Sequence, residues 1–414
     1  MQRIFVRFKS AEQKIDALQT VAFAEQEGGA AKFLFAQPNV LHTPATDEIR
    51  ARLEALGADI FEDVQFKVLP GGDEYDDFDD EAGRTQAPHV DLASDYSLRD
   101  VIEQVAAPKA WKHTRGEGVT IAIVDTGIAG ARPEFAAQRR SPIDLDSEYL
   151  GQHWVDPRGH GSMCATIAAG SQRDGGRYDG VAPGATVLAA RSTLKSTDLV
   201  DIYDELYRAR SEGKIAGPLV ISNSYGLYVC SSPAILPADH PYMTSILTAI
   251  ENGIFVCFAA GNNHRDECKH DPYACGPNSI WGPNSHDDVV SVGTVNRDFS
   301  NRDPMSPHMN SSRGPGEWAK KTKKPDCVAP TYGEVPWGTT FRRMRWWGTS
   351  GACPQVAGAA ALMLSVCPTL TPSQVAEGIL NTCSLLPDAK TCVGSGVLNC
   401  EAAVEKALDL RPSS

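Results

Sequence analysis

The sequence predicts an α/β fold, in which a parallel sheet is covered by helices on both faces and is preceded by a small α+β unit. From Leu98 onward, short apolar runs alternate with segments of helical periodicity, as is typical of parallel sheets. The first 70 residues show a different, more mixed order of elements. The chain has 414 residues, of which 42% are hydrophobic and 22% charged, enough for one large domain and one small one.

Each strand expected in the parallel sheet is apolar throughout, as a strand buried on both faces must be. These runs lie at residues 119–124, 186–190, 219–222, 254–258 and 289–292. Helical periodicity between them predicts helices that include residues 197–212 and 241–252. The longest apolar stretch, 357–366, falls short of the roughly 18 residues that a membrane span needs, so we expect a core helix there.

Residues 1–70 are expected to fold as a unit of their own. Strands are predicted at 3–8, 32–36 and 61–69, and a helix at 11–27. A second helix begins after Thr46 or Asp47, either of which can cap it, and runs to about residue 56, where Gly57 can end it. This βαβαβ order predicts a small α+β sandwich.

The composition then changes abruptly. Residues 71–81, GGDEYDDFDDE, are acidic and lack apolar periodicity, which indicates a solvated linker. We expect the linker to extend over residues 71–94, to be open to proteolysis as a candidate processing region, and to lead into a large domain at 95–414.

Charge and the N-terminal sequence limit the expected partners and location. The net charge of −13 repels phosphate backbones, so nucleic acid is not expected as a partner. Charged residues interrupt the apolar residues at the N-terminus, which therefore lacks the apolar core of a secretion signal. We expect a cytoplasmic protein with no membrane partner.

The chain has eleven cysteines, and reduced thiols are the expectation for a protein that is not exported. Four cysteines lie in apolar runs and are predicted to be core residues: Cys164, Cys257, Cys353 and Cys367.

Other cysteines occur at spacings that leave several interpretations open. Cys268, His270 and Cys275 could belong to a metal site, although no fourth ligand is evident, or the two cysteines could form a local disulfide. Cys392 and Cys400 flank a turn-forming segment that a disulfide could close.

Three segments carry residues suited to catalysis. In IAIVDTGIAG, a buried strand delivers Asp125 at its carboxyl end, where sites gather in α/β sheets. In RGHGSMCATIAAG, His160 stands between two glycines at the start of a small-residue helix. In WGTSGACPQVAGAAALML, Ser350 opens a long apolar helix, and Pro354 is expected in its first turn. Each has an ordinary alternative: a capping Asp, a surface His, an N-cap Ser.

Together these residues supply what acyl transfer requires. A serine hydroxyl becomes a good nucleophile when a base removes its proton, as His160 can. Asp125 can fix the tautomer of the imidazole and stabilise the imidazolium. The helix that begins at Ser350 places amide N–H groups and a positive partial charge where an oxyanion would form.

These segments, in the order Asp, His, Ser, resemble the signature blocks of the subtilisin-like (S8) serine protease family. FAAGNN resembles the family block that carries the oxyanion asparagine, which falls on Asn262, preceded by Ala260 and Gly261 at the substrate. ISNSYG resembles the strand that pairs with extended substrate, and it assigns substrate binding to Ser224, Tyr225 and Gly226. The resemblance covers residues 98–407.

The chain departs from the family pattern at positions that remove no reacting group. It has His-Gly-Ser-Met at 160–163 where His-Gly-Thr-His is usual, Gly351 where Met is common, and Gln355 in place of a frequent His. The departures indicate a divergent member.

The resemblance implies a serine endopeptidase that binds a protein or peptide substrate as an extended strand and needs no cofactor. It implies that the parallel sheet is mostly seven-stranded. Structural calcium is possible at a loop, residues 171–180, that contains Asp174 and Asp179. The first 70 residues resemble in size and order the family's ferredoxin-like propeptides, which implies a zymogen with an intramolecular inhibitor and chaperone.

Other functions remain open at this point. The chain could be an inactive relative that only binds peptides, or an esterase or amidase that uses the same triad. It could also be a processing protease with one dedicated client.

Overall fold

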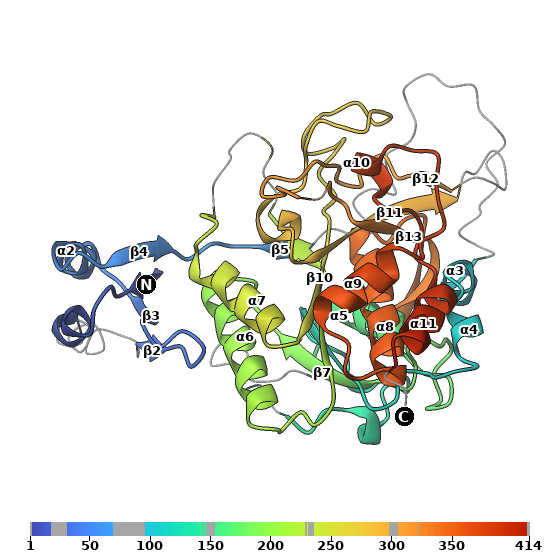
Figure 1. Cartoon of the computed structure of the whole chain (residues 1–414), viewed down its shortest axis with the longest axis horizontal. Coiled ribbons are helices and arrows are strands. Elements are labelled where there is room, and N and C mark those ends of the chain that lie inside the picture. Colours follow the sequence, from blue (N-terminus) through green and yellow to red (C-terminus); the bar gives the residue numbers. More distant parts are fainter. Residues whose placement is uncertain are drawn as a thin grey trace.

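The computed structural model describes residues 2–17, 31–68, 96–143, 145, 154–227, 230, 236–297, 305–321 and 323–411. Residues 2–17 and 31–62 form a small unit beside a larger α/β body (Figure 1). The chain from 69 to 95 contains the predicted acidic linker and lies outside the described residues.

The larger body is built on a seven-stranded sheet with the order β12-β11-β10-β8-β6-β7, with β13 also paired to β11. All pairings are parallel except that of β11 with β12, which is antiparallel. The mostly seven-stranded parallel sheet is therefore confirmed. Its strands are β6 (Thr120–Asp125), β7 (Thr186–Arg191), β8 (Leu219–Asn223), β10 (Phe255–Ala259), β11 (Val290–Arg297), β12 (Met305–Pro307) and β13 (Cys327–Pro330).

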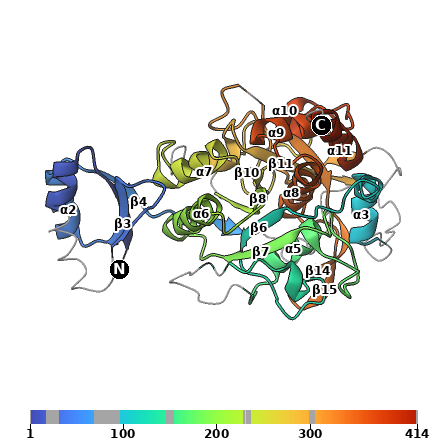
Figure 2. The same ribbon diagram turned by 60° about the horizontal axis from the view of Figure 1, so that its bottom comes forward.

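Helices cover both faces of this sheet (Figure 2). Successive residues of a strand point to opposite faces, so Ile121 and Ile123 join one core while Ala122 and Val124 join the other. The first core includes α5 (His160–Ala169), α8 (Thr349–Val366) and α11 (Cys400–Asp409), and the second includes α6 (Ser196–Ser211) and α7 (Pro241–Glu251). The remaining elements are α3 (Leu98–Gln104), α4 (Ala107–Ala110), η2 (Ala137–Arg139), η3 (Gly282–Ser285), β14 (Gly333–Trp337), β15 (Thr340–Met344), α9 (Pro372–Leu380) and α10 (Lys390–Val393).

Helix α8 differs from the prediction in one detail that matters for the site. It begins at Thr349, so Pro354 lies in its second turn and not its first. A proline has no N–H to donate to the carbonyl four residues earlier. The Ser350 carbonyl oxygen instead accepts from the Ser224 hydroxyl, at 3.1 Å, and from the Cys164 thiol, at 3.5 Å.

The N-terminal unit has a four-stranded antiparallel sheet in the order β2-β3-β1-β4. Its small core is formed by side chains of β1, β3 and α2, including Ile4, Leu41 and Leu53. The elements are β1 (Arg3–Arg7), β2 (Lys32–Phe33), β3 (Val40–Pro44), α2 (Asp47–Ala55) and β4 (Asp59–Glu62), and Thr46 caps α2 as expected.

Two strand predictions for this unit were wrong. The strand at 40–44 was not predicted, and the expected strand at 61–69 is split in two. Its first part lies in β4, while Lys67–Val68 forms β5, which leaves the unit and pairs with β9 (Tyr225–Gly226) of the larger body. Local sequence does not specify which sheet edge a strand joins, so this division depended on a partner more than 150 residues away.

The cysteine predictions were partly wrong. Cys164, Cys257, Cys353 and Cys367 are free and buried, as expected. Two disulfides join Cys230 to Cys268 and Cys275 to Cys392. Neither the local Cys268–Cys275 bridge nor the Cys392–Cys400 bridge forms, and Cys400 is a buried free thiol. The observed partners are 38 and 117 residues apart, distances at which sequence spacing carries no pairing information.

Among the described residues, we find no helix that combines the length and the apolar character needed to traverse a bilayer.

The disulfide pairs predict a specific peptide map. Digestion without reduction should yield linked peptides containing Cys275 with Cys392 and Cys230 with Cys268. The double variant Cys275→Ser/Cys392→Ser should lose about 2–5 kcal/mol of unfolding free energy in urea denaturation, because the unfolded chain gains freedom. A Cys392–Cys400 linkage in the peptide map would contradict the structure.

Candidate active site

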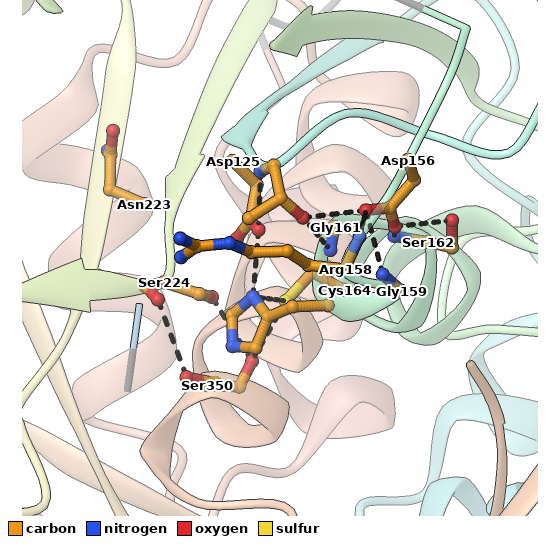
Figure 3. Close-up of polar contacts among 12 residues, drawn as sticks. Asp125, Asp156, Arg158, Gly159, Gly161, Ser162, Cys164, Asn223, Ser224 and Ser350 are labelled. Carbon is orange, nitrogen blue, oxygen red and sulfur yellow. Dashed lines mark hydrogen bonds and ion pairs between the residues drawn. The ribbon is translucent and has the colours of Figure 1, made fainter. Parts of the chain in front are cut away.

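Asp125 and His160 meet at the carboxyl end of β6. Asp125 is the last residue of that strand and His160 is the first of α5, and both are buried. The Asp125 Oδ1 atom lies 2.8 Å from His160 Nδ1, and the same oxygen accepts from the Thr126 amide at 2.7 Å (Figure 3). This contact leaves His160 Nε2 buried and without a hydrogen-bond partner among the described residues.

Glycine is required where the start of α5 crosses the turn that follows β6. A Cβ atom on Gly161 would lie 2.1 Å from the carbonyl oxygen of Gly127, far inside contact distance. Gly159, directly before the histidine, has a φ of 81°, in the left-handed region that favours glycine. The Gly-His-Gly sequence therefore lets α5 begin against the turn that follows Asp125.

Asp156 holds this arrangement together, and sequence reasoning missed it. Its carboxylate accepts from the Gly159 and Ser162 amides, both at 2.8 Å, and from the hydroxyls of Ser162 and Thr126, at 2.7 and 2.8 Å (Figure 3). It thus caps the start of α5 and ties it to the turn after β6. The available signal was an acidic residue four positions before the histidine.

The charges around His160 set its protonation. Burial alone lowers the pKa of the imidazole, because the charged form is desolvated. The carboxylates of Asp125 and Asp156 outweigh burial and the opposing field of Arg158, so the pKa of His160 lies above its ordinary value. A raised pKa makes the neutral imidazole a stronger proton acceptor.

Ser350 lies beside these groups at the start of α8. Its hydroxyl donates to the Ser224 carbonyl at 3.4 Å (Figure 3). The Cys164 sulfur lies 3.8 Å from His160 Nδ1 and 3.5 Å from the Ser350 carbonyl oxygen, and so it contacts both residues. The fold has therefore brought together three residues separated by up to 225 positions in the sequence.

Cys164 is best explained as packing behind the site. With Asp125 and His160 it forms the one group of three potential metal ligands within the described residues. Burial and the nearby Asp125 charge raise the pKa of the thiol well above its ordinary value, which keeps it protonated. Metals bind the thiolate, so this environment disfavours a metal there.

Asn262 lies on the other side of the nucleophile with its amide orientation fixed. Its Oδ1 accepts from the Thr349 amide, at 3.0 Å, and from the Thr349 hydroxyl, at 2.9 Å. Its Nδ2 is buried without a partner among the described residues. A Cβ on Gly348 would lie 2.6 Å from this nitrogen, so glycine is needed there for space. The Asn263 amide nitrogen, by contrast, donates to two backbone carbonyls.

The predicted substrate-binding residues lie near Ser350 and the start of α8. Ser224 contacts Ser350, and Tyr225–Gly226 forms β9, which is paired with β5. The Gly261 amide donates to Thr349 Oγ1 at 3.2 Å, and the Ala260 amide to Val292 O at 2.9 Å, so this segment is held beside the start of α8.

The calcium candidates do not converge on a site. Asp179 forms an ion pair with Arg115 at 2.8 Å, and Asp174 forms one with Arg139. Each carboxylate is neutralised by an arginine, whereas a calcium site gathers several oxygen ligands around one point.

A model of the subtilase family (peptidase S8) matches residues 116–402. The chain is 30% identical over 319 residues to the serine protease AprX of Bacillus subtilis strain 168, which covers 70% of this chain and 66% of AprX. It is 28% identical over 343 residues to a calcium-dependent protease of Nostoc sp., covering 73% and 48%. It thus spans about two thirds of AprX and about half of the Nostoc protein.

A solved structure shows the same fold. Fervidolysin from Fervidobacterium pennivorans, described as a keratinolytic enzyme related to subtilisin, superposes with a TM-score of 0.65. The likeness covers 98% of this chain and 61% of fervidolysin at 18% sequence identity, so it bears on the fold alone.

The charges around His160 predict opposite pKa changes in two variants. Asp156→Asn should lower the pKa of His160, because a carboxylate that stabilises the imidazolium is lost, and Arg158→Gln should raise it. Histidine NMR titration in a Ser350→Ala background, which prevents self-digestion, measures both. Since the base must be neutral, the low-pH limb of kcat/KM should move to lower pH in the first variant and to higher pH in the second. Shifts in the same direction would contradict this electrostatic account.

Proposed function

The chain belongs to the subtilase family, and on this premise we propose that it is a serine endopeptidase with Asp125, His160 and Ser350 as its catalytic triad. The observation that carries the proposal is the buried hydrogen bond between Asp125 and His160, which leaves His160 Nε2 unpartnered in the space shared with Ser350.

In the proposed mechanism, the Ser350 side chain rotates away from the Ser224 carbonyl and gives its proton to His160 Nε2 as its oxygen attacks the scissile carbonyl. Asp125 stabilises the imidazolium that results, and its hydrogen bond to Nδ1 keeps Nε2 available as the base. His160 then returns the proton to the leaving amine. Water, deprotonated by His160, then attacks the acyl-enzyme, and the acyl group leaves as Ser350 takes the proton back.

The oxyanion is proposed to bind between Asn262 Nδ2 and the Ser350 amide. The Asn262 amide needs no reorientation, because Thr349 already holds its oxygen. The Ser350 amide lies in the first turn of α8, where N–H groups have no partner within the helix. Preorganised donors of this kind stabilise the transition state without further ordering.

We propose that substrate lies along β9 as an extended strand, because β5 already binds there in that form. Lys67 pairs with Gly226 and Val68 with Tyr225 in antiparallel register. On the other edge of the same segment, the Phe66 amide donates to Leu194 O at 2.8 Å. A peptide inserted between two backbone edges suits an endopeptidase better than an esterase, whose substrate has no such strand to pair.

We assign residues 1–70 to a ferredoxin-like inhibitory domain, residues 71–94 to a processing region, and residues 95–414 to the catalytic domain. Residues 11–17, between β1 and β2, are helical and complete a βαββαβ order. This order and the β2-β3-β1-β4 sheet support the first assignment. The domain is proposed to block the cleft in an uncleaved zymogen and to assist folding of the catalytic domain. Cleavage within the processing region would then free the site.

Helices α6 and α7 form the surface that holds this domain. The Asp63 carboxylate accepts from the Thr197 amide at 3.0 Å at the start of α6. Farther along α6, the Asp204 carboxylate accepts from the Phe35 and Ala36 amides at 2.8 and 2.6 Å. The Phe66 ring is buried edge-on against Tyr225 and Tyr242.

No proposed step uses a metal or cofactor. The name of the Nostoc relative makes calcium worth testing, but Asp174 and Asp179 are not favoured as its ligands, because arginines neutralise them. The predicted cytoplasmic location stays a prediction. The two disulfides argue against it, since such bonds persist in oxidising compartments.

If Asn262 binds the oxyanion, removing its side chain should slow the chemical step and leave substrate binding little changed. Asn262→Ala should lower kcat on a peptide substrate by about 10²–10³-fold with KM little changed. Ser350→Ala should abolish cleavage, and Asn252→Ala, at the exposed end of α7, serves as the matched control. Peptide cleavage by wild type and not by Ser350→Ala tests the function as a whole. An Asn262→Ala variant with wild-type kcat would exclude the proposed oxyanion role.

Weakening the contacts between α6 and the proposed inhibitory domain should release that domain from the catalytic domain. Asp204→Ala removes two hydrogen bonds to a carboxylate and should raise the activity of the uncleaved chain by roughly tenfold or more. Glu205→Ala is the matched control, because that neighbouring carboxylate pairs with Arg208 of its own helix. Initial rates on a short peptide, with the chain shown intact by mass spectrometry, measure the effect. Equal rates for both variants would count against inhibition through this surface.

A further inference from the structure

Arg158 is a cation at the candidate active site whose side chain has no partner among the described residues. It lies two residues before His160, in a turn whose Arg158 and Gly159 amides donate to Asp156 Oδ1 at 3.1 and 2.8 Å. This turn fixes where the side chain begins. The side chain is exposed, and it forms no ion pair or hydrogen bond with the residues that the structure describes.

The guanidinium lies close enough to act on the catalytic imidazole. Its field lowers the pKa of His160, opposing Asp125 and Asp156. In Figure 3 the Arg158 side chain extends from the start of α5 towards Ser224, the residue whose carbonyl holds the Ser350 hydroxyl. In this view the Arg158 side chain thus extends towards the segment proposed to bind substrate.

A second arginine lies near the imidazole and is separated from it by a tryptophan ring. The Trp337 ring, at the end of β14, packs edge-on against the His160 ring with centroids 6.1 Å apart. The Arg342 guanidinium of β15 lies over that indole, 4.7 Å from its centroid. Two arginines therefore lie near the imidazole, although the chain as a whole carries a net charge of −13.

The register of β5 indicates which part of a bound substrate would lie near Arg158. Lys67 and Val68 pair with Gly226 and Tyr225, so a peptide in that register presents its next residue to Ser224 and Ser350. The residues on either side of the scissile bond must therefore pass between Ser224 and His160. That is where the Arg158 side chain extends.

We propose that Arg158 is a specificity-determining residue that favours substrates with an aspartate or glutamate within two residues of the scissile bond. The proposal rests on the proposed endopeptidase function and names its substrate class. A substrate carboxylate would supply an ion-pair partner for Arg158, which has none among the described residues.

The chain itself contains a sequence of this class. Seven of the eleven residues at 71–81 are Asp or Glu, and they follow β5 by a few positions. These residues lie outside the described part of the structure, and their composition alone makes the segment a candidate substrate.

Matched peptides test the proposal. A set of quenched fluorescent peptides places Asp or its isostere Asn at each of the two positions on either side of one cleavable bond. Wild type should cleave at least one Asp peptide about 1.5–5-fold faster in kcat/KM than its Asn partner, the range expected for one partly exposed ion pair. Raising the salt concentration should reduce this ratio, because ions screen the attraction.

Variants then assign the preference to the residue. Arg158→Gln should bring the Asp/Asn ratio to about one, and Arg158→Glu should invert it. The control Arg99→Gln, at an exposed arginine of α3, should keep the wild-type ratio. An Asp/Asn ratio near one in wild type, or a wild-type ratio retained in Arg158→Gln, would overturn the proposal. If wild type cleaves no peptide at all, the proposed function itself fails, whereas cleavage without acidic preference defeats this inference alone.

Discussion

A 2.8 Å hydrogen bond between Asp125 and His160, buried at the carboxyl end of β6, fixes the imidazole on which the proposed chemistry of the site depends. It requires a strand that ends at the aspartate and a helix that begins at the histidine. Glycine at 161 lets the two approach, and Asp156 ties them together. With Nδ1 engaged, Nε2 is the nitrogen left for a reaction. The carboxylates also keep the imidazole more basic than burial alone would allow.

Ser350 is held in place by hydrogen bonds from side chains of two other segments. Pro354 leaves the Ser350 carbonyl without its helical partner, and Ser224 and Cys164 fill that role. This joins α8 to the strand end that leads into β9. Because β5 occupies β9 through backbone pairing, the contact that would recognise a substrate is the contact that the N-terminal unit uses. Catalysis and its proposed inhibition thus depend on one strand edge.

The sequence predicted most of the larger domain, because its strands are apolar throughout and its motifs are local. Asp125, His160, Ser350 and Asn262 were all identified before the structure and lie together. Features that depend on distant partners were not predictable. The strand at 61–69 was split by pairing with β9, and Cys392 bonds Cys275 and not Cys400. Asp156 was missed because its role depends on amides that converge on it only after folding.

The most direct test of the account is covalent labelling of the chain with a fluorophosphonate as a function of pH, after its N-terminal domain has been removed by limited proteolysis. We expect a single adduct on the peptide that contains Ser350, formed at a rate that falls at low pH as His160 becomes protonated. An adduct on another residue, or no adduct from a folded catalytic domain at any pH, would contradict it.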